Sequence, residues 1–422
     1  MNTKCKDDLF YLCRKHLHTD LEEHERRSED FDIGQLSEVI AKNNMIVFLY
    51  NQLKELNKEL DYLDGTALND FDLYVRRRVI TEMGKYQAIR HVNAEAKKRG
   101  IKLIFFKGLI LADLYPQYAE RVSSDSDILV SDEQKEAAER LLCDCGYEKI
   151  EDECKTHVQV YENPVFSHTI ELHTRLWEDY EGPKIEILKS MDLASDETNI
   201  VIEACGIEVN TLGHEQHLLY QFFHIIKHFS LDGIGIRYLV DITLFVNRYY
   251  SDIDFDVFWK HVDMLGYTKF VEAFFEICID ELDLTYKVFY GHEIKFKGDL
   301  ENLKNDLLNI GNIADKEAGW QIMGAMEAYF TGDAAVPDSK IKKKINMIFP
   351  PVNALPKVYD YAIKYPVLLP VAWVHRGFKF LIKRQFHKDD FYGVREKINV
   401  AERRMILIEE LGLAADMQKD EH

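Results

Sequence analysis

The sequence predicts an α+β protein, in which a mixed β-sheet with helices packed against it is flanked by helical regions on both sides. Three observations support this fold class. Apolar residues recur at helical spacing through residues 1–98 and again beyond residue 213. Short runs of high β-propensity gather between residues 99 and 212. The 422 residues, 46% hydrophobic and 30% charged, have the composition of a globular protein with room for two or three domains.

We expect four regions along the chain. They are an N-terminal helical region at 1–98, a sheet-bearing core at 99–212, a second helical domain at 213–290 and a C-terminal helical region at 291–422. The first region shows no spacing of catalytic side chains, and we expect it to pack beside the core.

Charge and cysteine usage limit the partners and the compartment. With 53 basic and 73 acidic residues, the formal charge of -20 argues against an extended nucleic-acid-binding surface. Seven cysteines include no Cys-x-x-Cys pair, which favours free thiols in a reducing cytoplasm. We expect no signal peptide, because the first ten residues are charged and lack an apolar core. We expect no transmembrane segment, because the apolar run at 365–374 is far shorter than the span of about 20 residues that a bilayer requires.

The core opens with a strand, a turn and a helix. Leu103 to Phe106 form an apolar, β-prone run that stops at Lys107-Gly108, and helical spacing follows as far as Leu114. A second strand is predicted at Asp125-Ser126-Asp127 and the apolar residues after it. Alternate residues of a strand share a face, so Asp125 and Asp127 project together, about 7 Å apart along the chain. Two carboxylates placed in this way can converge on a divalent cation.

The rest of the core supplies a helix and further strands. Residues 131–145 predict a helix that ends at Gly146, and residues 147–150, 158–161 and 169–172 predict short strands. Residues 200–202 and 207–209 predict a hairpin that either extends the sheet or forms a flap.

Simpler interpretations of the Asp-x-Asp motif stay open. Aspartates at strand ends are common in ordinary turns. A calcium loop is disfavoured because Val130 stands at the sixth position from Asp125, where that loop needs glycine.

The order of these motifs resembles a known family. Lys107-Gly108 after a strand, a helix ending in Leu-Tyr-Pro, Arg121, and Asp125-x-Asp127 before an apolar strand are similar to the polymerase-β-like nucleotidyltransferases. The likeness is to a largely uncharacterised bacterial branch, in which Lys-Gly replaces the more familiar Gly-Ser. The resemblance implies three carboxylates, and Glu171 of the Glu171-Leu172-His173 step is the candidate for the third.

The resemblance also implies roles for individual residues. Asp125, Asp127 and Glu171 would be the catalytic residues and the ligands of Mg²⁺ or Mn²⁺. Without the Gly-Ser pair, the grip on the triphosphate would fall to Lys107, the backbone at Gly108, Arg121 or the Ser124 hydroxyl. Five further residues would line the cleft from the helical domain, with Asp241 orienting Arg237: His224, Lys227, His228, Arg237 and Asp241.

Two other interpretations of the histidines remain. His224 and His228 stand at i, i+4, the spacing of a metal pair, although no glutamate lies between them. Hydrogen-bonded histidines between packed helices are the favoured interpretation, because no third metal ligand is evident either.

The expected function is therefore metal-dependent transfer of a nucleoside monophosphate from an NTP to a hydroxyl or phosphate acceptor. A catalytically silent module of the same fold, binding nucleotide or a protein partner, is the alternative, and a helical interaction scaffold is a third hypothesis. The sequence identifies neither the acceptor, the preferred base nor the oligomeric state.

Overall fold

A computed structural model gives the structure of the chain. It describes residues 3–18, 33–61, 63–150, 157–177, 184–191, 193–231, 233–308, 360–373, 375, 403–404 and 406–413. The chain divides into two compact units. The first comprises Met1–His224, Gly235–Leu265 and Phe274–Ile294, and the second comprises Ile225–Ile234, Gly266–Ala273 and Lys295–His422. The four regions expected from the sequence remain a prediction.

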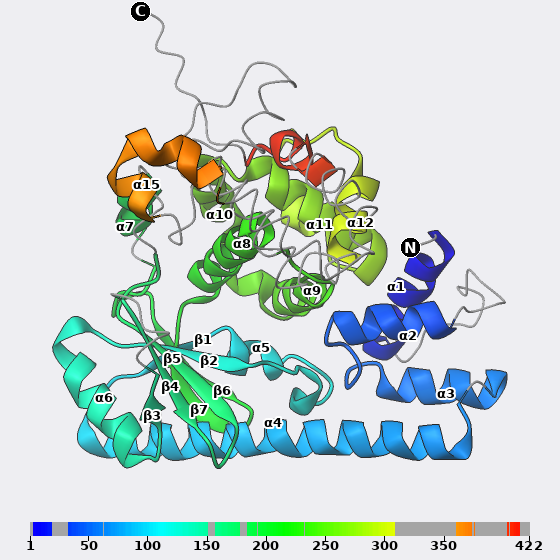
Figure 1. Cartoon of the computed structure of the whole chain (residues 1–422), viewed down its shortest axis with the longest axis horizontal. Helices are drawn as coiled ribbons and strands as arrows, with labels where there is room; N and C mark the ends of the chain where they lie inside the picture. The colour runs from blue at the N-terminus through cyan, green and yellow to red at the C-terminus, as the bar shows by residue number, and fades with distance from the viewer. Residues whose placement is uncertain are drawn as a thin grey trace, which may run out of the picture. The chain divides into compact units, whose positions relative to one another are not determined.

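The first unit is built on a seven-stranded mixed sheet in the order β3-β4-β5-β2-β1-β7-β6 (Figure 1). Its strands are β1 (Ile104–Phe106), β2 (Asp125–Leu129), β3 (Glu148–Lys149), β4 (Val158–Asn163), β5 (His168–His173), β6 (Ile200–Ala204) and β7 (Ile207–Thr211). The predicted α+β class is confirmed. Because β7 pairs with β1, the hairpin at 200–211 extends the sheet.

Two strand pairs fix the centre of the sheet. β2 runs antiparallel to β1, with Phe106 opposite Asp127. β2 runs parallel to β5, with Asp127 opposite Glu171. The carboxylates that the sequence placed on different strands therefore meet at one position of the sheet.

Helices of the first unit precede, interrupt and follow the strands. They are α1 (Thr3–Leu17), α2 (Ile33–Lys42), α3 (Tyr50–Leu60), α4 (Gly65–Arg99), α5 (Gly108–Ala112), α6 (Lys135–Asp144), α7 (Lys184–Ser190), α9 (Arg237–Tyr249) and α10 (Phe255–Met264). Helix α8 (His214–Leu231) and helix α11 (Thr268–Leu282) each contribute to both units. Short 3-10 turns include η2 (Tyr118–Glu120), which leads towards β2.

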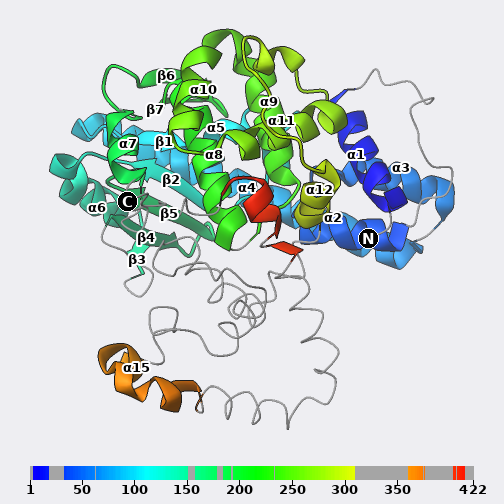
Figure 2. The same ribbon diagram turned by 90° about the horizontal axis from the view of Figure 1, so that it is seen from above.

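Helix α4 covers one face of the sheet. It begins at Asp64, whose carboxylate caps the amides of Thr66 and Ala67, and ends at Gly100 with φ of 68°. Its apolar side joins α6 and the inward residues of the strands in one continuous core, and Figure 1 shows it running beneath the strands. Figure 2, seen from above, shows α6 beside the edge strand β3. Phe105 points into the core that α4 covers, so the next residue, Phe106, lies on the other face of the sheet. There Phe106 packs edge-on against Tyr220 of α8, with ring centroids 5.2 Å apart.

The second unit has its own buried contacts. Its described elements include α12 (Leu300–Leu308), α15 (Asp360–Lys364) and η11 (Pro366–Leu368). The buried Arg404 guanidinium pairs with Asp306, Nε to Oδ1 at 3.3 Å, and donates to the carbonyl of Phe229. The Glu272 carboxylate accepts from the backbone amides of Lys295 and Phe296.

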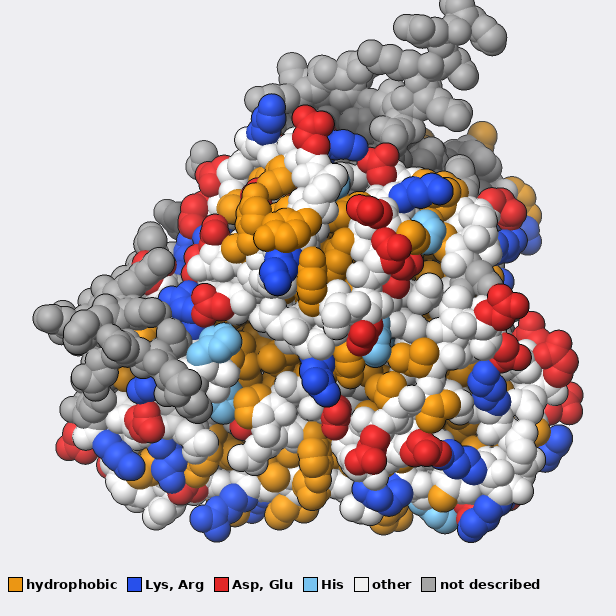
Figure 3. All heavy atoms as spheres, turned by 180° about the vertical axis from the view of Figure 1, so that it is seen from behind, with side chains coloured by type: hydrophobic (Ala, Val, Ile, Leu, Met, Phe, Trp, Pro, Cys, Tyr) orange, Lys and Arg blue, Asp and Glu red, His pale blue; other side chains and the backbone are white. Residues whose placement is uncertain are grey.

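The surface and the thiols agree with the composition. On the face drawn in Figure 3, acidic and basic side chains intersperse over the described part of the chain. Six described cysteines, Cys5, Cys13, Cys143, Cys145, Cys205 and Cys278, are free thiols. Cys154 lies outside the described residues. Within the described ranges, no helix is long and apolar enough to cross a membrane.

Candidate active site

A compact group of ionisable side chains, which we call the carboxylate group, lies at the centre of the sheet. One ligand atom from each of Asp127, Glu171 and His173 lies within 4.8 Å of the other two. Asp127 and Glu171 are opposite one another in the parallel β2–β5 pair, and His173 follows two residues after Glu171 on the same face of β5. The register of two neighbouring strands therefore positions all three side chains.

A lysine and a histidine face the carboxylates of this group. The Lys107 ammonium lies 2.7 Å from Oδ1 of Asp127, and both side chains are buried. The His173 ring, through Nε2, is 3.3 Å from the same oxygen and 3.4 Å from Oε2 of Glu171. Glu171 is the most open member, with a side chain 34% exposed. A ligand can therefore reach the group at Glu171, whereas Asp127 is buried.

The pKa values follow this arrangement. Burial works against ionisation of Asp127, but the Lys107 ammonium and the His173 ring outweigh it and lower the pKa of the carboxyl. Burial disfavours the charged His173 ring, yet its hydrogen bonds to Asp127 and Glu171 raise its pKa overall. Burial, together with the Asp127 charge, raises the pKa of Asp125. Of the three predicted carboxyls, Asp125 therefore has a raised pKa, whereas the pKa values of Asp127 and Glu171 are lowered.

Lys107 is held in an unusual backbone conformation. It ends β1 with φ of 53° and ψ of -110°, in a region that side-chain-bearing residues rarely adopt. Its amide donates to Nε2 of His217, at 3.0 Å, and its ammonium reaches Nδ1 of His224, at 3.4 Å. Gly108 follows at the start of α5, where an added Cβ would lie 3.4 Å from the carbonyl oxygen of Asp125. The Lys-Gly turn thus aims the lysine into the group while β2 passes close behind it.

Arg121 lies in a second, separate ion pair. Its guanidinium donates to both carboxylate oxygens of Asp241, at 2.8 and 2.9 Å, and the two side chains are 6% and 2% exposed. The Tyr115 hydroxyl donates to Asp241 Oδ1 at 2.8 Å, and Nη1 of Arg121 approaches the Gly108 carbonyl at 3.5 Å. We call these residues, Tyr115, Arg121 and Asp241, the arginine clamp. Asp241 therefore pairs with Arg121, whereas the resemblance had it orienting Arg237.

The remaining predicted residues lie around the group in different ways. Ser124 is exposed immediately before β2. Arg237, at the start of α9, donates to the Val122 carbonyl at 2.6 Å, and its charge acts on Asp125. His224 contacts Lys107, as described above. Lys227 and His228 lie further along α8, in the part that belongs to the second unit.

The comparison with known proteins assigns the family. The sequence matches the family described as uncharacterised nucleotidyltransferases over residues 29–280. The chain belongs to this family. The resemblance seen in the segment from Lys107 to His173 is thereby confirmed, and the protein is a nucleotidyltransferase by family. No curated protein matches its sequence.

Solved structures show more distant likenesses to this nucleotidyltransferase. The solution structure of the antibiotic-resistance factor ANT(2'')-Ia has 13% identity and a TM-score of 0.32, over 44% of this chain and 90% of that chain. A crystal structure of ANT(2'')-Ia with adenylyl-2''-tobramycin has 13% identity and a TM-score of 0.32, over 43% and 97%. An antigenic nucleotidyltransferase-like protein from Paracoccidioides brasiliensis has 15% identity and a TM-score of 0.27, over 40% and 76%. The family match alone carries the assignment.

The donor set of this nucleotidyltransferase fits a divalent cation. Carboxylate oxygens are the ligands that Mg²⁺ and Mn²⁺ prefer, and Asp127 and Glu171 bring such oxygens together. An imidazole nitrogen is less typical of Mg²⁺. His173, whose Nε2 lies 3.3 Å from Asp127 and 3.4 Å from Glu171, is therefore better placed to orient the two carboxylates than to replace one.

Two histidines of the site were not singled out from the sequence. His173 enters the sequence analysis only as the last residue of the Glu171-Leu172-His173 step, although the pattern Thr-x-Glu-x-His places it on the strand face of Glu171. No role was predicted for His217. It lies fully buried beside Lys107, and burial lowers its pKa to about 3, so it accepts the Lys107 amide proton as a neutral ring. Its contact with a residue 110 positions away has no signal in the sequence.

Proposed function

We propose that the chain transfers a nucleoside monophosphate from an NTP to a hydroxyl or phosphate acceptor in a metal-dependent reaction that releases pyrophosphate. The observation that carries the proposal is the meeting of Asp127 and Glu171 at one register position of β2 and β5, inside a member of a nucleotidyltransferase family. Asp125 shares the β2 face and would be the third carboxylate. The acceptor class is part of the proposal, since nothing in the site specifies it.

Each residue then has a defined task. Asp127 and Glu171, with Asp125, would hold Mg²⁺ or Mn²⁺, which neutralises the phosphates when bound. Glu171, the most exposed carboxylate, would accept the acceptor proton. Lys107 would move from Asp127 to the triphosphate, because its ammonium is the cationic group in contact with the carboxylates. The Gly108 backbone, Ser124, Arg237 and His224, all in the first unit, would complete the contacts to nucleotide.

The contacts within the arginine clamp suggest roles for Arg121 and Asp241 that differ from those implied by the resemblance. With both oxygens of Asp241 occupied, Arg121 keeps only Nη1 for a phosphate, and that atom already faces the Gly108 carbonyl. We propose that Arg121 acts by holding the Lys-Gly turn in place, and that Asp241 acts through Arg121.

The test measures the thermal midpoint with each of the four NTPs, with and without magnesium. A ligand at a hundredfold excess over its dissociation constant adds about 2.7 kcal/mol of stability, which shifts the midpoint measurably. We expect one nucleotide to give a magnesium-dependent shift that is lost in Asp125→Asn, Asp127→Asn. Pyrophosphate release is then followed with candidate hydroxyl and phosphate acceptors.

The matched control is the double variant with Asp70→Asn and Asp132→Asn, which removes two exposed carboxylates elsewhere in the first unit. It should keep both the shift and the release. A shift that persists in the Asp125→Asn, Asp127→Asn protein would remove these residues from the site.

One observation favours a silent nucleotide-binding module as the second candidate. The Lys107 ammonium already neutralises Asp127, at the place where a catalytic cation is required. This candidate predicts a nucleotide shift that does not need magnesium and no pyrophosphate release with any acceptor.

A further inference from the structure

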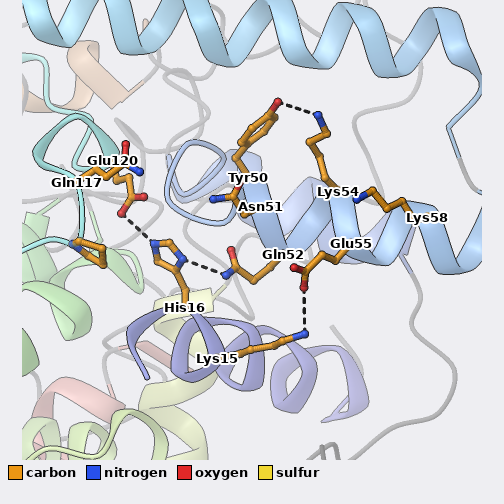
Figure 4. A pocket seen from close by; sticks show the side chains of 11 residues that line it. Lys15, His16, Tyr50, Asn51, Gln52, Lys54, Glu55, Lys58, Gln117 and Glu120 are labelled. Atoms are coloured by element: carbon orange, nitrogen blue, oxygen red, sulfur yellow. Dashed lines mark hydrogen bonds and ion pairs between the residues drawn. The ribbon is translucent and has the colours of Figure 1, made fainter. Parts of the chain in front are cut away.

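A polar cavity of about 590 Å³ lies in the first unit, away from the carboxylate group. Its walls are α1, α3 and the segment around η2 (Figure 4). It is lined by Lys15, His16, Tyr50, Asn51, Gln52, Lys54, Glu55, Lys58, Pro116, Gln117 and Glu120. The volume falls within the range of small-molecule sites, about 300–1,000 Å³. None of these residues belongs to the group around Asp127 or to the arginine clamp.

A buried chain of hydrogen bonds forms one wall of this cavity. The Glu120 carboxylate lies 2.9 Å from Nε2 of His16, and Nδ1 of His16 is 3.0 Å from the Gln52 side-chain nitrogen. His16 and Glu120 have side chains only 8% exposed. Figure 4 shows the chain crossing from η2 through α1 to α3. Because these groups hold one another, the wall is fixed before any ligand arrives.

One member of that wall has unused hydrogen-bonding capacity. Gln52 is 9% exposed, and its Oε1 has no hydrogen-bond partner among the described residues. A buried amide oxygen without a partner is uncommon in folded proteins. It is an acceptor suited to a ligand hydroxyl, and the amides of Asn51 and Gln117 add donors and acceptors to the same lining.

Three lysines give the cavity a positive rim in a chain of net charge -20. Lys15 pairs with Glu55 at 3.2 Å, and Lys54 pairs with Asp72 at 3.2 Å and bonds to the Tyr50 hydroxyl. Lys58 is exposed and has no counter-ion among the described residues. An anion that reaches the rim therefore meets at least one ammonium that is free to bind it.

We propose that this cavity binds a small, hydroxyl-rich organic phosphate. The lysine rim, with Lys58 foremost, holds the phosphate. The amides and the Glu120–His16–Gln52 chain hold the hydroxyl groups. Apart from Pro116 and the Tyr50 ring, every lining residue carries a fully polar or charged head group, which favours a ligand that combines hydroxyls with a charge.

The test uses ribose 5-phosphate, glucose 6-phosphate and glycerol 3-phosphate as probes, with inorganic phosphate and free ribose as comparison ligands. Binding is measured by calorimetry on the full chain and on Asp127→Asn. We expect at least one organic phosphate to bind, more tightly than inorganic phosphate or ribose, and equally to both proteins. Equal binding by Asp127→Asn separates this cavity from the proposed reaction site.

The deciding variant is Lys58→Met, which removes the unpaired ammonium at an exposed helical position. It should weaken binding about tenfold, the loss expected for one charge-assisted contact. The matched control Lys260→Met, an exposed lysine of α10, should leave binding unchanged. Failure of all three organic phosphates to bind, equal binding by inorganic phosphate, or equal binding by Lys58→Met would each overturn the proposal.

Discussion

The carboxylate group and the arginine clamp are both built from opposite charges in the first unit, yet they differ in completeness. In the clamp, both oxygens of Asp241 accept from Arg121, and the Tyr115 hydroxyl adds a third bond to Oδ1. In the carboxylate group, one oxygen of Asp127 faces both Lys107 and His173, and Glu171 is one-third exposed. Both carboxylate oxygens of the clamp are therefore hydrogen-bonded within it, whereas the carboxylates of the carboxylate group can still accept contacts from a ligand.

This difference separates stability from function. A buried ion pair with ideal two-point geometry fixes the chain and offers nothing to a substrate. A group with shared oxygens and shifted pKa values is the arrangement found at reactive sites. We therefore propose that Arg121 and Asp241 support the structure, whereas Asp127 and Glu171 take part in the chemistry.

The largest expected effect comes from breaking the clamp. Arg121→Met leaves the Asp241 carboxylate buried without its partner, and we expect a loss of about 3–5 kcal/mol in the free energy of unfolding. Asp127→Asn should cost clearly less stability, because the charges of Asp125 and Glu171 still act on Lys107. Urea unfolding monitored by circular dichroism measures both variants.

Two further variants sharpen this test. Arg140→Met, which removes an exposed pair with Glu136, should change stability by less than about 0.5 kcal/mol. Arg121→Met, Asp241→Leu should recover part of the loss, because no unpaired charge remains. If Arg121→Met unfolded no more easily than Asp127→Asn, the assignment of the clamp to stability would be wrong.

The next effect concerns pH and the opposite face of β2. There His168 bonds to the Ser126 and Tyr147 hydroxyls, and burial lowers its pKa from 6.5 to about 3. The unfolded chain therefore takes up the proton first as the pH falls. Stability from this residue is complete above pH 6.5 and declines from there towards pH 3. The decline is about 1.4 kcal/mol for each pH unit.

Urea unfolding at several pH values between 7 and 4 measures this slope. His168→Gln keeps an amide able to bond to both hydroxyls but does not titrate, so its slope should be shallower than that of the wild type. His91→Gln, at an exposed position of α4, should keep the full slope. Identical slopes in the wild type and in His168→Gln would show that His168 is not the titrating group.

The sequence predicted those parts of the molecule that depend on local patterns. Strand alternation placed Asp125 and Asp127 on one face, and the turn chemistry of Lys107-Gly108 marked the end of β1. The order of motifs then identified the family. Glu171 came from that order and not from any local signal, and the structure places it opposite Asp127.

Local sequence patterns could not predict the contacts between segments that are far apart in the chain. Arg121 and Asp241 are 120 residues apart, and nothing near either residue shows that they meet. The chain of Glu120, His16 and Gln52 joins three separate segments for the same reason. Such pairs are fixed by how helices dock on the sheet, which depends on the whole core and not on the residues nearby.

The smallest expected effect tests the carboxylate group by removing its internal cation. Lys107 lies 2.7 Å from Asp127, so a divalent cation that takes Asp127 as a ligand must displace its ammonium. Lys107→Met should therefore bind Mn²⁺ more tightly than the wild type, by about tenfold, when no nucleotide is present. Titration followed by electron paramagnetic resonance of Mn²⁺ measures this directly.

The affinity for nucleotide should change in the opposite direction to the affinity for Mn²⁺. This opposite change distinguishes competition between Lys107 and the metal ion for Asp127 from a general effect of removing a positive charge. With a triphosphate present, the lysine is needed on the phosphates, so Lys107→Met should bind nucleotide more weakly although it binds Mn²⁺ more tightly. Lys102→Met, an exposed lysine paired with Asp196, should change neither affinity. Unchanged or weaker Mn²⁺ binding by Lys107→Met would mean that the ammonium does not compete for Asp127, and that the carboxylate group is as internally complete as the clamp.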